Sequence, residues 1–275
     1  MLLKKYNTHA IKALGQNFLI NKHILDKVIE ASEISEEDFV IEIGPGLGFL
    51  TKRLAERSKH VLVVEIDAKM VEVLMHELPS NVRVIHGDAM KTNWKKELTE
   101  LGWQGEKVKI AANLPYYITT PILFMFLEGE LPVSQMVMMM QKEVAERIKA
   151  APGGKEYGSL SVAVQYRCEV EKVCAVKSDS FFPQPEVESA VMKFSFFDEK
   201  PVQPKDEAMF SRVVRASFAQ RRKTLRNTLG AVFAELKPQL PELLESVSVN
   251  PTRRGETLSV AEFAAVADKF YEVLN

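Results

Sequence analysis

The stretch Phe39-Val-Ile-Glu-Ile-Gly-Pro-Gly-Leu-Gly48 decides the fold class of this chain. Residues 39–43 are apolar apart from one glutamate, and they predict a buried strand that runs directly into a glycine-rich turn. Residues 49–57 then have the composition of a helix. Glycine adopts positive φ angles without steric strain and lets a backbone approach a ligand closely. A strand, a glycine-rich turn and a helix in this order are typical of α/β folds that bind nucleotides.

The spacing of the glycines narrows the class of ligand. Gly44, Gly46 and Gly48 follow the pattern G-x-G-x-G, which differs from the dinucleotide pattern G-x-G-x-x-G, and no Lys-Ser or Lys-Thr pair follows them. A phosphate cradle is therefore poorly supported. Residues 61–64 predict the next strand, and Glu65 stands at its end. A carboxylate there can accept both ribose hydroxyls of an adenosine-type ligand, although a surface carboxylate after a strand is the ordinary alternative.

Two further predicted strands also end on polar side chains. Residues 82–85 predict the third strand, after which Asp88 can either hydrogen-bond an adenine amine or cap a helix. Residues 108–112 predict the fourth strand, which is followed by Asn113-Leu-Pro-Tyr-Tyr117. An amide offers a donor and an acceptor, and ligands bind at the strand ends of open α/β sheets. A turn with a buried tyrosine is the alternative, because Asn and Pro are common turn residues.

Three later strands complete the predicted sheet. Residues 133–140 are mostly apolar and predict the fifth strand, and residues 169–177 and 189–197 are expected to finish the sheet as an antiparallel pair. Between that pair lies Phe181-Phe-Pro-Gln-Pro185, whose prolines stiffen a loop that presents an aromatic ring. Such a ring can form one wall of a base-stacking slot or can plug the sheet edge. Residues 152–155 predict a flexible loop next to the site.

The pattern changes after a short polar stretch bracketed by Pro201 and Pro204. Beyond it the apolar spacing is helical throughout, over residues 208–218, 224–236, 241–247 and 260–274. The sequence therefore predicts an α/β domain at residues 1–200, with an N-terminal arm at 1–22, and a small helical domain at 201–275.

Composition and charge distribution bound the function. The chain has 275 residues, a net charge of −1 and a pI of about 6.6, so it carries no global nucleic-acid signature. Residues 211–230, however, hold six Lys or Arg and no acidic residue, and residues 1–27 hold five Lys against one Asp. These segments predict a localised polyanion-binding patch or, as the alternative, solvated faces.

Other composition features point to a cytoplasmic protein. No apolar stretch reaches the roughly 20 residues that a membrane span requires, and no secretory signal follows Met1. Cys168 and Cys174 have no nearby His, so we expect reduced thiols and neither a zinc site nor a disulfide framework.

Together these segments resemble one family, the small-subunit ribosomal RNA adenine dimethyltransferases of the KsgA type, whose relatives include the erythromycin-resistance rRNA methyltransferases. The glycine motif alone is only methyltransferase-like, whereas the other motifs are far more specific. The matching segments follow the family's order across nearly the whole chain: Gly15-Gln-Asn-Phe-Leu19, Glu42-Ile-Gly-Pro-Gly-Leu-Gly48, Glu65, Gly87-Asp-Ala-Met90, Asn113-Leu-Pro-Tyr116, Phe181-Phe-Pro-Gln-Pro-Glu-Val-Glu-Ser189 and Arg221-Arg-Lys223.

The resemblance implies a fold, an activity and a partner. The expected fold is a Rossmann-like, seven-stranded methyltransferase sheet followed by helices. The expected activity uses S-adenosylmethionine to dimethylate the N6 amines of two adjacent adenosines near the 3′ end of small-subunit (16S) rRNA. The expected partner is the small ribosomal subunit with its rRNA, in the cytoplasm, with neither a membrane nor an obligate protein partner.

The resemblance also assigns roles by position in this sequence. The donor would be bound by Asn17, Leu19, Gly44, Gly46, Glu65, Asp88 and Asn113. The acceptor adenine would be bound by Asn113, Leu114, Pro115, Tyr116 and Phe181. Arg221, Arg222, Lys223 and Arg226 would bind RNA, and no residue would bind a metal. Tyr117 is a departure, because many bacterial members are expected to have Asn there.

Three alternatives remain open at this stage. A large-subunit rRNA adenine methyltransferase of the macrolide-resistance type would share the site but differ in its target. A non-catalytic assembly factor on the same fold is disfavoured by the intact motif at residues 113–116. An NAD-dependent dehydrogenase is disfavoured by the glycine spacing.

Overall fold

The computed structural model describes residues 15–275, which form two compact units. We call the first the sheet unit; it is built from the chain up to Ala145 together with Val170–Phe196. The second, the helical unit, comprises Glu146–Glu169 and Phe197–Asn275. This division differs from the predicted one at residues 200 and 201, because the segment 146–169 belongs with the C-terminal helices.

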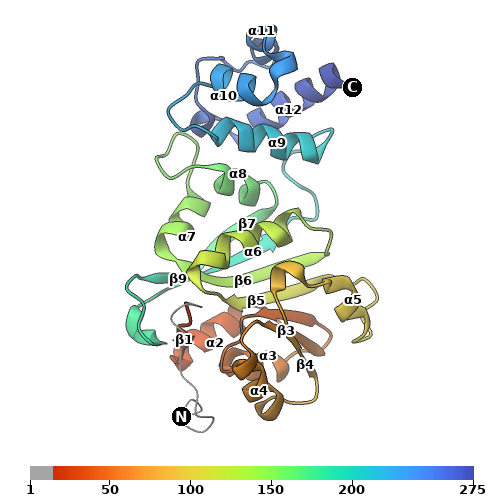
Figure 1. The fold of residues 1–275 in the computed structure, drawn as a ribbon, viewed down its shortest axis with the longest axis vertical. Coiled ribbons are helices and arrows are strands. Elements are labelled where there is room, and N and C mark those ends of the chain that lie inside the picture. The colour runs from red at the N-terminus through yellow and green to blue at the C-terminus, as the bar shows by residue number, and fades with distance from the viewer. Residues whose placement is uncertain (1–14) are drawn as a thin grey trace. The chain divides into compact units, whose positions relative to one another are not determined.

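A seven-stranded sheet forms the sheet unit, with the order β4-β3-β2-β5-β6-β9-β7 (Figure 1). Strands β2 to β6 pair in parallel, and β9 runs antiparallel to β6. The α/β class and the Rossmann-like sheet are thus confirmed. The strands are β2 (Phe39–Ile43), β3 (His60–Glu65), β4 (Val82–His86), β5 (Val108–Asn113), β6 (Val133–Gln141), β7 (Cys168–Val176) and β9 (Ser189–Phe196).

The strand order fixes where a ligand can bind. The first strand of the parallel series, β2, lies between β3 and β5. The chain adds β3 and β4 on one side of β2, and then β5 and β6 on its other side, so the strand order reverses between β2 and β5. Ligands of open α/β sheets bind at such a switch point, beyond the carboxyl ends of the strands. Strands β2 and β3 are almost wholly buried, as expected for parallel strands covered on both faces.

Helices connect these strands and cover the sheet (Figure 1). Most agree with the predicted segments, but the helix predicted from Pro121 begins earlier, at Tyr116, with Pro115 as its N-cap. Pro121 therefore lies inside α6, where it cannot donate a backbone hydrogen bond. Buried apolar side chains of the helix, such as Phe126, offset that loss. The helices are α2 (Lys22–Ala31), α3 (Phe49–Ala55), α4 (Ala68–Glu77), α5 (Trp94–Thr99), α6 (Tyr116–Glu128) and α7 (Lys142–Lys149).

The helical unit has its own hydrophobic core. Buried Phe210, Phe233 and Phe263 come from the C-terminal helices, and Tyr157 and Tyr166 join the same cluster. That packing explains why residues 146–169 belong to this unit. Its helices are α8 (Ser159–Gln165), α9 (Glu207–Phe218), α10 (Leu225–Val232), α11 (Leu240–Ser246) and α12 (Val260–Leu274).

The loop at residues 152–155 is tied into the helical unit. The backbone N–H of Gly153 donates to the carbonyl of Glu256 at 2.7 Å, and Arg221 donates to the carbonyl of Lys155. The loop predicted there thus belongs to the helical unit and makes these two hydrogen bonds within it.

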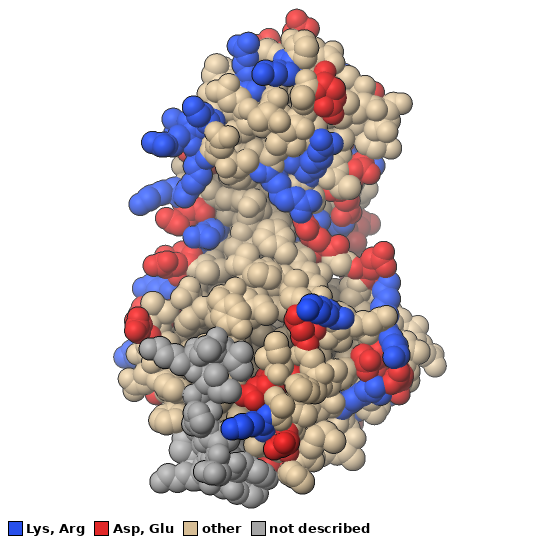
Figure 2. All heavy atoms as spheres, viewed as in Figure 1, with Lys and Arg blue, Asp and Glu red and all other residues tan. Residues whose placement is uncertain are grey.

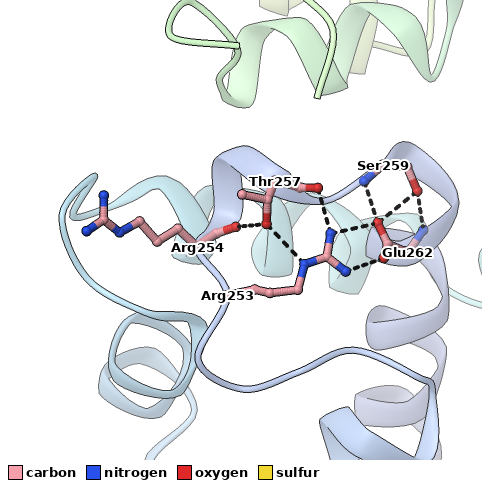
Figure 3. Close-up of polar contacts among 5 residues, drawn as sticks. All are labelled: Arg253, Arg254, Thr257, Ser259 and Glu262. Atoms are coloured by element: carbon pink, nitrogen blue, oxygen red, sulfur yellow. Dashed lines mark hydrogen bonds and ion pairs between the residues drawn. The ribbon is translucent and has the colours of Figure 1, made fainter. Parts of the chain in front are cut away.

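A polar cluster marks the start of α12 (Figure 3). Ser259 Oγ accepts from the N–H of Glu262 at 3.2 Å, and the N–H of Ser259 donates to Glu262 Oε2 at 2.8 Å, which is a capping box. Arg253 donates to the same carboxylate and to the carbonyl of Thr257. These bonds from Arg253 hold the pKa of Glu262 below its ordinary value.

Within residues 15–275, none of the helices has the length and apolarity that crossing a membrane requires.

Candidate active site

One cavity of the sheet unit collects the residues that the sequence singled out. It opens beyond the carboxyl ends of β2 to β5, at the switch point of the sheet. Its walls include every residue predicted to touch donor or acceptor: Asn17, Leu19, Gly44, Gly46, Glu65, Asp88, Asn113, Leu114, Pro115, Tyr116 and Phe181. The predicted RNA-binding residues Arg221, Arg222, Lys223 and Arg226 belong to the helical unit, where all four are exposed.

The described part of the N-terminal arm forms one wall of the cavity. Strand β1 (Phe18–Leu19) pairs antiparallel with β8 (Phe181–Phe182), which ties the arm to the proline-rich loop. Gln16 Nε2 also donates to Asp67 Oδ2 at 2.8 Å. The rest of the predicted arm, residues 1–14, lies outside the described residues.

Close packing of the arm depends on the glycine-rich turn. Gly44 and Gly46 have φ angles of +62° and +55°, the left-handed region that glycine occupies without strain. A Cβ atom at Gly46 would lie 2.8 Å from two ring carbons of Phe18. The turn therefore admits the Phe18 ring only because residue 46 has no side chain.

Glu65 is fixed at the tip of β3 by backbone donors. Its side chain is buried, Oε2 accepts from the N–H of Gly46 at 3.2 Å, and Oε1 accepts from the N–H of Asp67 at 2.9 Å. Burial raises the pKa of Glu65. Because a carboxylate has about four acceptor positions, two backbone bonds leave room for the hydroxyls of a ribose.

Glu42 is a cavity residue to which sequence reasoning assigned no role. It is 2% exposed, and within the described part of the chain its Oε2 atom has no hydrogen-bond partner. Burial, together with the nearby charge of Glu65, raises the pKa of Glu42 to about 8. A buried acceptor without a partner costs free energy unless a ligand satisfies it. The sequence signal was a carboxylate inside an otherwise apolar strand, directly before the glycines.

The charges around the cavity decide which ligands suit it. Among the described residues its walls carry three acidic side chains, those of Glu42, Glu65 and Asp88, and neither lysine nor arginine. With a pKa of about 8, Glu42 holds its proton at neutral pH and adds little negative charge. Such a site favours a cationic ligand and disfavours the pyrophosphate of a dinucleotide. Residues 15–275 contain no group of His, Cys, Asp and Glu side chains arranged to hold a metal ion.

Asp88 caps a short turn and also lines the cavity. Its Oδ1 atom accepts from the N–H of Met90 at 2.9 Å and so caps the 3₁₀ turn Ala89–Lys91. The side chain is half-buried and also lines the cavity. The cap orients the carboxylate without closing it to a ligand.

Asn113 ends β5 with its carboxamide oriented by the arm. Its Nδ2 atom donates to the carbonyl of Asn17 at 3.4 Å, which directs the amide oxygen away from that contact. Beside it, the Tyr116 hydroxyl lies 2.7 Å from Ser189 Oγ, and burial raises the pKa of this tyrosine. The contact with Ser189 fixes the direction of the Tyr116 ring.

Phe181 and Phe182 point to opposite sides of their strand. Phe181 is 2% exposed and packs in the core of the sheet unit, while Phe182 is 45% exposed. Phe181 thus forms part of the hydrophobic core and part of the cavity wall at once, so the two readings of this loop are compatible.

The chain is similar in sequence to known proteins along nearly its whole length. The family model Ribosomal RNA adenine dimethylase matches residues 7–266. "Ribosomal RNA small subunit methyltransferase A" of Bacillus mycoides (strain KBAB4) is 47% identical over 272 residues, which cover 97% of this chain and 93% of that protein. The protein of the same name from Geobacillus sp. (strain WCH70) is 45% identical, with 99% and 96% covered.

Two solved structures resemble the whole chain. A dimethyladenosine transferase from Plasmodium falciparum is 29% identical with a TM-score of 0.79, covering 93% of this chain and 98% of that one. The 23S rRNA methyltransferase ErmE shares the fold, with 22% identity, a TM-score of 0.65 and coverage of 92% and 99%. On its sequence, its fold and the make-up of this cavity, the chain belongs to the ribosomal RNA adenine dimethylase family.

Proposed function

We propose that this protein transfers methyl groups from S-adenosylmethionine to the N6 amines of two adjacent adenosines near the 3′ end of small-subunit (16S) rRNA, during ribosome biogenesis. The observation that carries the proposal is a single cavity that joins a carboxylate-rich pocket to the motif Asn113-Leu-Pro-Tyr116. Two relatives that are 45% and 47% identical are named as methyltransferases of the small-subunit ribosomal RNA, which supports that RNA as the target.

The donor fits the carboxylate-rich end of the cavity. S-adenosylmethionine, when bound, supplies a methyl group that its positively charged sulfur has already activated. Glu65 would accept the ribose hydroxyls, Asp88 would accept from the adenine amine, and Glu42 offers an unpaired acceptor beside the glycine turn. Gly44 and Gly46 would let the backbone approach the methionine part, and Asn17 and Leu19 would cover it from the arm.

The acceptor adenine fits between the aromatic walls beside Asn113. The Asn113 Oδ1 atom and the main-chain carbonyl of Leu114 would accept the two hydrogens of the amine, and Pro115 stiffens the turn that follows. Tyr116 and Phe181 would hold the two faces of the base, which is worth about 1–3 kcal/mol per stacked base. Stacking of this size offsets the free energy of extruding a base from its own stack.

Positioning carries most of the proposed rate enhancement. The amine lone pair of adenine is conjugated into the ring, so it attacks a methyl group only when it is aimed at it. Holding two reactants in this way can lower a barrier by roughly 7–11 kcal/mol. The amine proton released on methylation passes to water, so the chain needs no general base.

The helical unit is proposed to dock the RNA. Figure 2 shows lysine and arginine side chains gathered at the left edge of this unit. Arg221, Arg222, Lys223 and Arg226 are exposed, in the segment after α9 and in the first turn of α10. Basic side chains in such a cluster bind phosphates and supply affinity that falls steeply with salt.

A large-subunit target is the alternative within the family fold. An assay with tritiated donor separates the two targets: unmethylated small subunits are compared with protein-free large-subunit RNA, and dimethyladenosine is mapped by mass spectrometry. We expect two adjacent dimethyladenosines near the 3′ end of the small-subunit RNA. Modification of the large-subunit RNA alone would overturn the proposed target, and no transfer to either RNA would favour a non-catalytic assembly factor.

A further inference from the structure

Tyr117 is the most exposed of the Phe, Tyr and Trp residues that the structure describes. It is 64% exposed, against 45% for Phe182, yet it lines the same cavity as Asn113. Tyr117 sits in the first turn of α6, directly after the motif at residues 113–116. An exposed aromatic ring therefore lies beside the proposed acceptor slot, the space between Tyr116 and Phe181 next to Asn113. Neither the proposed donor contacts nor the contacts to the adenine in this slot involve Tyr117.

The two adjacent tyrosines serve different sides of this mouth. Successive residues of a helix point about 100° apart, so their rings diverge. The Tyr116 hydroxyl is bonded to Ser189 at the start of β9, 2.7 Å away. Tyr117 instead lies against the arm, since a Cβ at Gly15 would be 3.6 Å from its Cε1 and 3.7 Å from its Cδ1. The Tyr117 ring thus lies near Gly15 of the arm, while 64% of the residue is exposed.

The proposed substrate supplies an occupant for this open ring. Its two target adenosines are adjacent, so when one base occupies the slot, the other is a single phosphodiester link away and lies near the mouth. Withdrawing one base from a stack also removes a stacking partner from its neighbour. An aromatic side chain can replace that partner for any base, because every base has a π face.

We propose that Tyr117 stacks on the nucleotide adjacent to the adenosine held in the slot, and so binds the adenosine pair as one unit. This inference rests on the proposed function, because it requires an acceptor of two neighbouring nucleotides. It makes Tyr117 a substrate-positioning residue, distinct from the groups that contact the reacting amine.

Variants of Tyr117 with matched RNAs test the proposal. Tyr117→Ala should weaken binding of a hairpin RNA carrying the two adenosines by about 5- to 160-fold, and Tyr117→Phe should retain the wild-type affinity because the ring remains. An RNA with an abasic site beside the slotted adenosine should bind the wild-type protein more weakly by a similar factor. The affinity of Tyr117→Ala should be the same for this RNA and for the intact one, because the double-mutant cycle then shows that the ring and the base contact each other. Phe197→Ala, at an exposed ring outside the cavity walls, is the matched control.

Two other readouts separate the possible failures. Donor affinity, measured by calorimetry with S-adenosylhomocysteine, should be the same in Tyr117→Ala and wild type. A parallel loss of donor affinity would mean that Tyr117 only supports the arm, and unchanged RNA affinity would mean that it contacts no base; either result overturns the inference. If the wild-type protein methylates no small-subunit RNA, the proposed function itself is wrong. That result is seen in the wild-type protein, whereas the two results above are seen only in Tyr117→Ala.

Discussion

Asn113 carries the most specific of the proposed roles at the scale of single residues. Asn113→Ala removes the oxygen that would accept an amine hydrogen, so we expect methyl transfer to fall by about 100-fold or more. Donor affinity should fall much less, because Glu65 and Asp88 remain. Transfer of tritium to small-subunit RNA and calorimetry with S-adenosylhomocysteine measure the two effects.

A matched variant controls for loss of a carboxamide elsewhere. Asn93→Ala removes the side chain that caps α5 by accepting from the N–H of Lys96, and Asn93 does not line the cavity. It should keep wild-type transfer apart from a small loss of stability. An Asn113→Ala enzyme with most of its turnover intact would rule out the proposed role.

Glu42 makes stability depend on pH. Its pKa is about 8 in the folded protein against an ordinary value of 4.5, so between these values the folded state holds a proton that the unfolded state has lost. The free energy of unfolding should therefore fall as pH rises from about 5 to 8. Glu42→Gln should remove this decline and stabilise the free protein near pH 8, by on the order of a few kcal/mol.

Urea unfolding between pH 5.5 and 8.5 measures this difference. Glu36→Gln, at an exposed carboxylate, should follow the wild-type profile at every pH. If wild type and Glu42→Gln show the same pH dependence, Glu42 is ionised in the folded protein and the assignment of a buried, neutral acid is wrong.

At the scale of elements, the turn between β2 and α3 must leave space for the arm. Gly46→Ala would force an alanine to φ +55° and place its Cβ 2.8 Å from the Phe18 ring. We expect a loss of about 1–3 kcal/mol beyond the backbone strain, and weaker donor binding, because the ring and β1 must shift. Gly102→Ala is the control, since it has φ +86° and no atom within 4 Å of the added Cβ. Equal melting temperatures for the two variants would show that the arm does not depend on Gly46.

At the scale of the whole molecule, the basic cluster after α9 should govern the salt dependence of binding. Arg222 and Lys223 are exposed, and no carboxylate among the described residues pairs with either. Arg222→Ala/Lys223→Ala should weaken binding to small subunits and reduce the slope of log affinity against log salt by about 1.5. Lys95→Ala/Lys96→Ala, which removes the same charge from α5, should leave the slope unchanged. A slope that does not change in the first variant would place the RNA elsewhere.

The core of the helical unit includes residues that precede β7 in the chain. Tyr157 and Tyr166 precede β7 in the chain, but they pack with Phe210 and Phe263 in the helical core. A chain ending at residue 205 would leave these rings without their partners, so we expect it to aggregate. Sedimentation of the expressed fragment tests this, and a soluble, monomeric fragment that binds donor would contradict it.

Local patterns in the sequence were sufficient for the strands of the large sheet and for the polar residues at their ends. Glu65, Asp88 and Asn113 each follow a short apolar run, and parallel strands must present such ends along one edge of a sheet. The glycine spacing and the basic stretch at residues 221–226 are equally local. These features depend only on neighbours in the chain, so periodicity and spacing predict them.

Only the tertiary structure decided which distant segments meet. The pairing of Leu19 with Phe181, the bond from Asn113 to the arm and the packing of residues 146–169 with the C-terminal helices all join parts far apart in sequence. The unpartnered Glu42 and the open face of Tyr117 likewise follow from what surrounds them. Burial and the lack of a partner are properties of the packed neighbourhood, and that neighbourhood forms only when the chain folds.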